Sequence, residues 1–261
     1  MAFASLGQDR VAYNIEGSGA PLVLLHGTGG DSFSNWGTLI PALAQQFTVI
    51  SIDYAGSGAT ECDAEELTLA HLSAQIIAVL DDAGFAQTSI AGFSLGAVIA
   101  AHVAATHPAR IQRLVMLAGF AGGPNSRMQL QFAHWLDLIT SAPERMARHI
   151  LLTGFSPAFL ERLSADDINK RQKAIVRFTN WPGMAKQTQL DAVLDIHPLL
   201  QDIKQPTLVI GCRHDQMIPV QLTQALCEHI AQAQYVEINS GHLATLENPK
   251  AVLEQLQTFL S

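Results

Sequence analysis

Cysteine, clustered positive charge and long apolar runs are all scarce in this sequence. The three cysteines, Cys62, Cys212 and Cys227, are odd in number and widely spaced, which suits reduced, packed thiols better than a disulfide framework or a metal site. The 15 Lys and Arg residues are scattered, and 23 Asp and Glu give a net charge of −8. Because nucleic-acid binding requires clustered positive charge, this balance argues against a nucleic-acid partner.

Signals for membranes, export and nucleotide cofactors are also missing. The most apolar stretch, residues 97–105, is interrupted by His102 and is too short to cross a bilayer. The opening residues, MAFASLGQDR, lack the basic and apolar parts of a secretory signal, so we expect a cytoplasmic location and no membrane partner. There is no P-loop, and Gly27-Thr28-Gly29-Gly30 lacks dinucleotide-binding spacing, so we expect no cofactor and no metal. The expected partner is a small-molecule substrate, and the oligomeric state is left open, a homo-oligomer included.

What is present is an alternation of short β-rich runs with helical stretches. The β-rich runs span residues 11–15, 22–25, 47–52, 89–91, 114–117, 207–210 and 235–238, and helical spacing marks residues 36–45, 68–83, 95–106, 221–230 and 251–260. Several runs have no polar alternation, which indicates strands buried on both faces. The first two runs, separated by Glu-Gly-Ser-Gly-Ala-Pro, predict a hairpin at a sheet edge. The pattern predicts an α/β fold with a mostly parallel sheet flanked by helices.

The alternation fails between residues 119 and 198. Helix-like segments follow one another there, with Pro143, Pro157 and Pro182 between them and no convincing strand. We interpret residues 119–198 as a helical cap insertion into a core domain made of residues 1–118 and 199–261. Most large apolar residues of the insertion should simply pack it onto the core.

The sharpest local signal is Gly92-Phe93-Ser94-Leu95-Gly96, which lies between a β-rich run and a helical stretch. A nucleophilic serine needs to project from a tight strand-to-helix turn, and flanking glycines let the backbone approach closely there. Ser94 would then stand at a helix N-terminus, where the N–H of Leu95 can stabilise an oxyanion. The glycine-rich loop after the 22–25 run predicts a second oxyanion donor, the N–H of Thr28.

A base and an acid for this serine follow later in the chain. His242, after the last β-rich run, is the candidate general base, and Asp215, after the 207–210 run, is the candidate carboxylate that orients it. Their order, Ser, Asp, His, is the one expected when a serine sits in such a turn. Two rivals are interpreted as loop-organising residues, namely His26 beside the glycine-rich loop and Asp53, which precedes the serine.

These motifs resemble the α/β-hydrolase fold family, and within it the serine esterases, enol-lactonases and cofactor-free perhydrolases. The resemblance covers almost the whole chain and rests on His26-Gly27, Asp53 with Gly56 and Gly58, Gly92 to Gly96, Asp215 with Pro219, and Gly241-His242 with Glu247-Asn248-Pro249. It implies an eight-stranded, mostly parallel sheet with a helical cap. Dehalogenases and epoxide hydrolases of the same fold carry an aspartate nucleophile where this chain has Ser94, so halide or epoxide attack is disfavoured.

The function we expect is a serine hydrolase that cleaves a carboxylic ester, lactone or thioester through an acyl-enzyme on Ser94. Its substrate would be small to medium in size and apolar, because large apolar side chains are available to line a pocket. The candidates, each also explicable as packing, are Phe33, Phe93, Trp135, Phe155 and Trp181. Two alternatives stay open: a lyase, cyclase or cofactor-free oxygenase that uses the His242–Asp215 pair as base, and a ligand-binding receptor.

Overall fold

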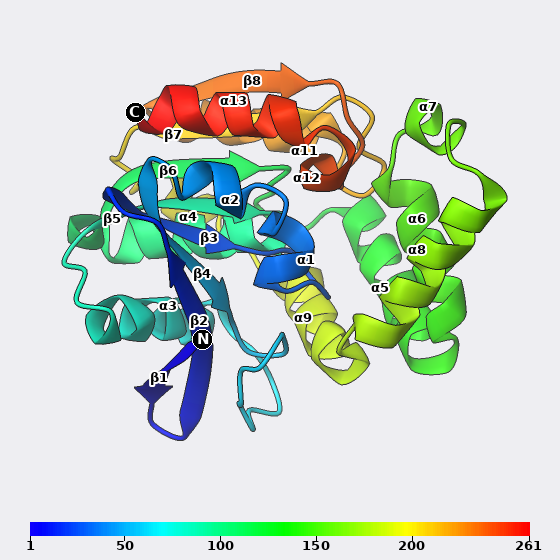
Figure 1. Ribbon diagram of the computed structural model, residues 1–261, viewed down its shortest axis with the longest axis horizontal. Helices are drawn as coiled ribbons and strands as arrows, with labels where there is room; N and C mark the ends of the chain where they lie inside the picture. The colour runs from blue at the N-terminus through cyan, green and yellow to red at the C-terminus, as the bar shows by residue number, and fades with distance from the viewer.

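One twisted eight-stranded sheet forms the centre of the molecule (Figure 1). The computed structural model describes all residues, 1–261. The strands lie in the order β1-β2-β4-β3-β5-β6-β7-β8. Their bounds are β1 Ala2–Leu6, β2 Asp9–Glu16, β3 Ala20–Leu25, β4 Phe47–Asp53, β5 Thr88–Phe93, β6 Ile111–Leu117, β7 Thr207–Cys212 and β8 Ala233–Ile238.

Every pairing from β4 to β8 is parallel, while β1, β2 and β4 pair antiparallel. The strands β5 and β7 are buried along their whole length, as expected when both faces of a parallel sheet are covered. The predicted mostly parallel sheet, and the eight strands that the resemblance implies, are confirmed.

The predicted hairpin between the first two β-rich runs is wrong. The strand β2 pairs with β1 and β4, and β3 pairs with β4 and β5, so β4 lies between β2 and β3. Four of the six β3 residues are buried, which suits a central strand and not an edge. The true edge hairpin is β1–β2, whose first strand was not predicted.

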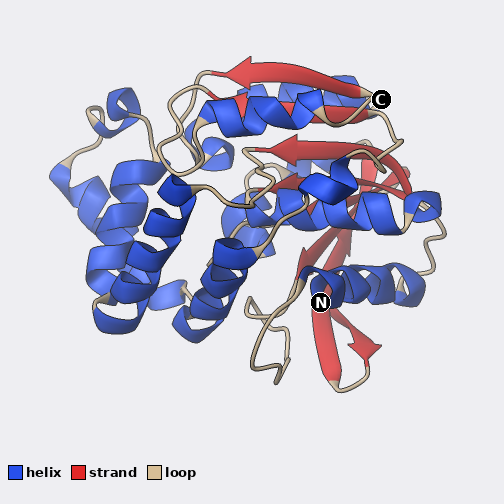
Figure 2. Ribbon diagram, turned by 180° about the vertical axis from the view of Figure 1, so that it is seen from behind, coloured by secondary structure: helices blue, strands red, loops and turns tan.

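Helices cover both faces of the sheet, as predicted (Figure 2). The bounds outside the cap region are α1 Ser32–Trp36, α2 Ile40–Leu43, α3 Leu69–Asp82, α4 Leu95–Thr106, α10 His197–Leu200, α11 Val220–Ala225, α12 Ala244–Glu247 and α13 Pro249–Leu260, with 3₁₀ turns at Pro108–Arg110 and Leu226–Glu228. Residues of α3 and α4 join the larger core cluster on one face, and residues of α2 and α13 join the cluster on the other. The helix expected over residues 36–45 is instead split into α1 and α2, because Gly37 ends the first and Pro41 begins the second.

Five helices fill the region between β6 and β7, and we refer to them as the cap helices. They are α5 Ser126–Ser141, α6 Pro143–Gly154, α7 Pro157–Leu160, α8 Ala165–Phe178 and α9 Trp181–Val193. The carboxyl ends of the parallel strands point towards them, and α9 lies nearest to the core (Figures 1 and 2).

No helix of the chain combines the length and apolar character needed to cross a membrane.

The tightest point of the fold is the turn between β5 and α4. Ser94 adopts a φ of 55° there, a conformation that side chains other than glycine rarely take. A Cβ at Gly92 would lie 2.1 Å from the carbonyl oxygen of Gly96, and one at Gly96 would lie 2.3 Å from that of His26. Positions 92 and 96, two residues before and two after Ser94, are therefore glycine because backbone occupies the space that a side chain would need.

This contact makes a prediction about Gly96. Alanine normally favours a helix over glycine by about 1 kcal/mol, yet Gly96→Ala should lower the free energy of unfolding by more than ~2 kcal/mol, because the clash is with backbone that cannot rotate away. Urea denaturation measures the change. Ala105→Gly, a half-buried position on the same helix where no backbone clash arises, should cost only ~1 kcal/mol, mainly through helix propensity. An alanine variant as stable as the wild type would contradict the argument.

Candidate active site

A small cavity lies at the carboxyl ends of the central strands and brings Ser94 and His242 together. Its volume is about 60 Å³, and its walls include Ser94, His242, Thr28, Phe93, Trp135 and Leu243. Ser94 directly follows β5, Thr28 follows β3, and His242 follows β8. Parallel strands present their carboxyl ends at one sheet edge, which is why segments so distant in sequence meet here.

Ser94 is the residue that precedes the first turn of α4. Its own N–H donates to the carbonyl of Leu117 at 2.9 Å, which fixes the turn against β6. The N–H groups of Leu95 and Thr28, the two expected oxyanion donors, donate to no group within the protein, although Gly27 and Gly29 on either side of Thr28 both do. Two free backbone donors beside a helix N-terminus can stabilise a developing negative charge.

The expected carboxylate and imidazole are in contact. The Nδ1 atom of His242 lies 2.6 Å from Oδ2 of Asp215, and both side chains are almost fully buried. The other carboxylate oxygen of Asp215 accepts from the N–H groups of Met217 at 2.9 Å and Ile218 at 2.7 Å. These bonds hold the carboxylate in one orientation, so that it can fix the tautomer of the ring.

The serine and the histidine share the cavity without a hydrogen bond between Ser94 Oγ and the His242 ring. The contact of His242 Nδ1 with Asp215 leaves Nε2 as the ring nitrogen that can serve the cavity. Phe93 lies against the ring, with centroids 4.9 Å apart, and limits its movement. Catalytic hydrogen bonds of this kind commonly tighten only when substrate is bound.

The rival residues hold loops, as the sequence interpretation expects. The His26 ring is fully buried, stacks on Tyr54 at 3.9 Å and lies 2.8 Å from the carbonyl oxygen of Gly27 through Nδ1. Burial is the largest effect on this ring and lowers its pKa, so it stays neutral. Asp53 accepts from the N–H of Ser32 at 2.8 Å, and a side chain at Gly58 would collide with its carboxylate.

Glu247 fastens the loop that carries His242. Its Oε2 atom accepts from the N–H of Gly241 at 3.1 Å and from the N–H of Ser156 at 2.8 Å. A Cβ at Gly241 would lie 2.6 Å from the backbone of Phe155, so this loop is pressed against the segment after α6. The position of the imidazole therefore depends on cap residues as well as on β8.

A larger cavity adjoins the first, and three of the five predicted pocket residues line one of the two. The larger cavity has a volume of about 480 Å³ and shares Thr28, Met184 and Leu243 with the small one. Phe93 and Trp135 line the small cavity, and Phe155 lines the large one.

The other two predicted pocket residues lie elsewhere. Phe33 is 83% exposed, because α1 buries Ser32, Asn35 and Trp36 and so turns Phe33 to the opposite side. Trp181 borders neither cavity. Its indole N–H donates to the carbonyl of Val176 at 3.1 Å, which holds the ring at the junction of α8 and α9. The position of these residues in the chain, Phe33 on a short core helix and Trp181 in the cap, gave no information on which way either ring would face.

Two buried residues of α9, Gln187 and Asp191, were not predicted. The Gln187 Oε1 atom accepts from the N–H of Gly29 at 2.8 Å, and Asp191 accepts from the hydroxyl of Thr28 at 2.6 Å. Burial, opposed in part by this hydrogen bond, raises the pKa of Asp191 to about 7. Their only signal in the sequence is a four-residue spacing of polar side chains on a helix.

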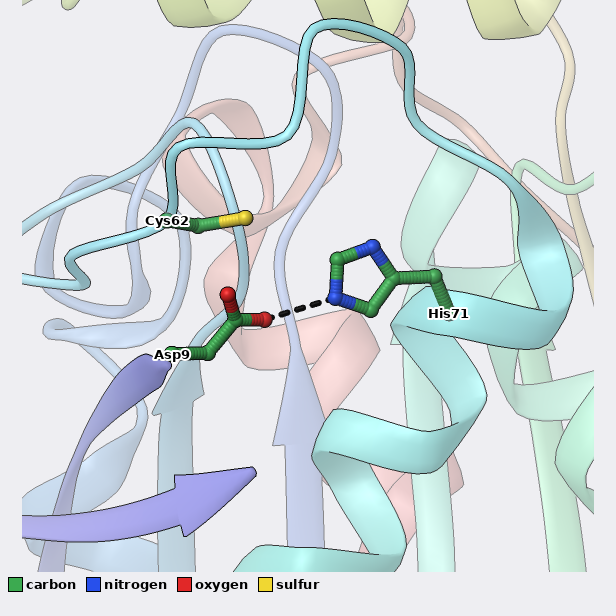
Figure 3. A group of neighbouring side chains, drawn as sticks. All are labelled: Asp9, Cys62 and His71. Atoms are coloured by element: carbon green, nitrogen blue, oxygen red, sulfur yellow. Dashed lines mark hydrogen bonds and ion pairs between the residues drawn. The ribbon is translucent and has the colours of Figure 1, made fainter. Parts of the chain in front are cut away.

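One group outside the cavities offers metal-ligand chemistry, namely Asp9, Cys62 and His71 (Figure 3). One donor atom from each lies within 4.8 Å of the others. His71 and Gln75 both contact the same oxygen of Asp9 at 2.6 Å, so the carboxylate already has partners. Burial raises the pKa of the Cys62 thiol, which disfavours the thiolate that a metal would need. We interpret the group as a hydrogen-bonded anchor for the loop that precedes α3.

The geometry agrees with comparisons to known proteins. A family model described as alpha/beta hydrolase fold matches residues 20–249. The chain belongs to the α/β-hydrolase fold family. A pyrrolizixenacetamide deacetylase from Xenorhabdus hominickii is 40% identical over 98% of this chain and 96% of its own length. Another relative, named as a carbamate hydrolase, from Azorhizobium caulinodans, is 27% identical over 99% of this chain and 98% of its own.

Solved α/β hydrolases agree in structure as well. The enol-lactonase from Burkholderia xenovorans superposes with a TM-score of 0.88, at 26% identity, over 99% of both chains. A hydrolase from Pseudomonas aeruginosa reaches 0.89, at 27% identity, over 100% of this chain and 98% of its own. The protein is accordingly an enzyme, a hydrolase of ester- or amide-type bonds.

The buried carboxyl of Asp191 predicts a dependence of stability on pH. Because its pKa is raised on folding, the protonated form is favoured in the native state, and stability is lost as the pH rises from about 4 to about 7. At 1.36 kcal/mol per pH unit, Asp191→Asn should gain ~3 kcal/mol over the wild type between pH 5 and pH 8. Urea denaturation at both pH values measures this difference, and Asp202→Asn at an exposed carboxyl is the control. An equal difference at both pH values would show that Asp191 is not protonated on folding.

Proposed function

We propose that this hydrolase removes a short acyl group from a larger apolar alcohol or amine by way of an acyl-enzyme on Ser94. The observation that carries the proposal is the small cavity itself. It is lined by Ser94, His242 and Thr28, the N–H of Thr28 has no partner in the protein, and Asp215 contacts the histidine ring at 2.6 Å.

In the proposed mechanism, His242 takes the proton of Ser94 as its oxygen attacks the substrate carbonyl. The N–H groups of Leu95 and Thr28 then donate to the oxyanion, each contributing ~3 kcal/mol to the barrier reduction. Asp215 stabilises the imidazolium that forms. His242 gives its proton to the leaving alcohol or amine, and water, activated by the same ring, releases the acid and restores Ser94.

The sizes of the two cavities support the assignment of acyl and leaving groups. The small cavity of about 60 Å³ is several times larger than the ~10–15 Å³ that one water molecule needs, a size that suits an acetyl or similarly short acyl group. The adjoining cavity of about 480 Å³ suits the larger part of the substrate. Its walls include the apolar residues Ile150, Phe155 and Ile175 and the cationic residue Arg171. These walls favour an apolar group that carries a hydrogen-bond acceptor for the arginine.

A relative supports the same division. The Xenorhabdus hominickii protein, at 40% identity, is named as a deacetylase of an acetamide, and an acetyl group is the size that the small cavity accepts. This name supports extending the candidate substrates from esters to amides, for which His242 would protonate a poorer leaving group.

The serine step is tested by Ser94→Ala. The variant should lose at least ~10³-fold in kcat on p-nitrophenyl acetate, and a fluorophosphonate probe should label the wild type but not the variant. Ser89→Ala, on the same strand before the turn, is the control and should keep both properties. Turnover without labelling would instead support base chemistry by the His242–Asp215 pair, and full activity of Ser94→Ala would rule out the acyl-enzyme.

The acyl preference is tested with p-nitrophenyl esters of graded length. In the wild type, kcat/KM should fall at least ~10-fold from acetate to hexanoate, because methylenes that do not fit cost binding in the transition state. Trp135→Phe opens the wall of the small cavity and should bring the two substrates closer together. Trp181→Phe, which borders neither cavity, should leave the ratio unchanged. A wild type that prefers hexanoate would contradict the division of the cavities.

A further inference from the structure

The loop that carries the proposed oxyanion donor is held at three successive residues. The N–H of Gly27 donates to Oδ1 of Asn35 on α1 at 2.8 Å. The N–H of Gly29 donates to Oε1 of Gln187 at 2.8 Å, and the hydroxyl of Thr28 donates to Asp191 at 2.6 Å. Of the three backbone N–H groups at residues 27, 28 and 29, only that of Thr28 has no acceptor. Two of the three restraints come from α9, a cap helix.

Gln187 joins two loops of the core to each other. Its side chain is fully buried. Besides accepting from Gly29, it donates to the carbonyl of Ala55 at 3.0 Å and to the hydroxyl of Ser57 at 2.9 Å. Every donor and acceptor of the Gln187 side-chain amide except one lone pair is therefore used. A shift of α9 would displace both the loop at Gly29 and the loop at Ala55 and Ser57. The close backbone contact of Gly183 with Gly56, where a Cβ would come within 2.0 Å of the carbonyl oxygen, clamps the same helix at its first turn.

Asp191 is a buried carboxyl with no role in the proposed chemistry. It is 4% exposed, takes part in none of the ion pairs of the chain, and its Oδ1 atom has no hydrogen-bond partner. Burial of such a group lowers stability, and its raised pKa reflects that cost. Its single hydrogen bond is accepted from the Thr28 hydroxyl. The carboxyl can therefore influence the orientation of Thr28.

We infer that Asp191 and Gln187 are positioning residues that hold the Thr28 N–H in the geometry of the oxyanion hole. The inference rests on the proposed function and goes beyond it, because it makes a cap helix part of the catalytic geometry. Neither residue touches the substrate. Their effect should be confined to the transition state, where the oxyanion forms, because a displacement of ~1 Å at such a donor is enough to cost ~10²-fold in rate.

The test compares variants that break the restraint with one that keeps it. Asp191→Leu and Thr28→Val each remove the hydrogen bond while roughly preserving volume, and Asp191→Asn retains an acceptor for the Thr28 hydroxyl. The matched control is Thr188→Val, a fully buried threonine of α9 whose hydroxyl bonds only to its own helix, at the carbonyl of Met184. Steady-state kinetics on p-nitrophenyl acetate and urea denaturation are measured for each.

Asp191→Leu and Thr28→Val should each lower kcat ~10–100-fold and leave KM within ~3-fold, the signature of an interaction made only in the transition state. Asp191→Asn and Thr188→Val should stay within ~3-fold of the wild-type kcat. The Asp191→Leu/Thr28→Val double variant should be no slower than the slower single variant, because both changes remove one interaction. Gln187→Leu, which frees Gly29 instead, should show the same loss of kcat and provides a second route if Asp191→Leu does not fold.

Different failures have different meanings. Folded Asp191→Leu and Gln187→Leu variants that keep the wild-type kcat and lose only stability would overturn the positioning role and leave the hydrolase proposal intact. Losses in kcat that add in the double variant would also overturn it, because the two side chains would then act separately. A wild type that neither hydrolyses the ester nor reacts with a fluorophosphonate would instead refute the proposed function itself.

Discussion

Backbone contact at the turn between β5 and α4 is the constraint on which the rest of this site depends. Gly92 approaches the carbonyl of Gly96, and Gly96 approaches the carbonyls that end β3. These contacts leave no room for a side chain at position 92 or 96, and the serine between them adopts a positive φ. The hydroxyl is thereby raised above the sheet edge, next to the loop in which the free N–H of Thr28 can complete an oxyanion hole.

The cap helices brace this edge from both sides. On the oxyanion side, α9 holds Gly29 and Thr28 through Gln187 and Asp191. On the histidine side, the segment after α6 contacts Gly241 through backbone, and Glu247 bonds both this loop and Ser156. The N–H of Leu243 also donates to the carbonyl of Gly154. Because hydrogen bonds join the cap helices to both the Thr28 loop and the His242 loop, a movement of these helices would alter the catalytic geometry as well as the walls of the cavities.

The sequence allowed prediction of features that are set by local backbone chemistry. The G-x-S-x-G turn, the chain order in which Ser94, Asp215 and His242 follow separate strands, and the mostly parallel sheet all follow from short-range patterns. The position of β4 between β2 and β3 could not be predicted, because strand order is decided by packing across the sheet and not by the turn between two runs. The outward face of Phe33 and the inward face of Asp191 were equally hidden, since each depends on the rotation of a helix against segments far away in sequence.

Departures from the ordinary rules of stable packing gather at the same edge of the molecule. The two residues other than glycine with positive φ, Ser94 and Ala118, directly follow β5 and β6. Three buried side-chain atoms lack a hydrogen-bond partner, in His26 after β3, Ser240 after β8 and Asp191 on α9. Each lowers stability, by ~1–3 kcal/mol for a strained backbone or an unpaired buried group. The opposite ends of the strands carry none of these features. The destabilising features are therefore associated with the catalytic edge and are not a general property of the fold. Burial of both faces of the sheet supplies enough stability to offset these costs. One end of the molecule can therefore be arranged to stabilise the negative charge of a reaction intermediate, at the expense of packing.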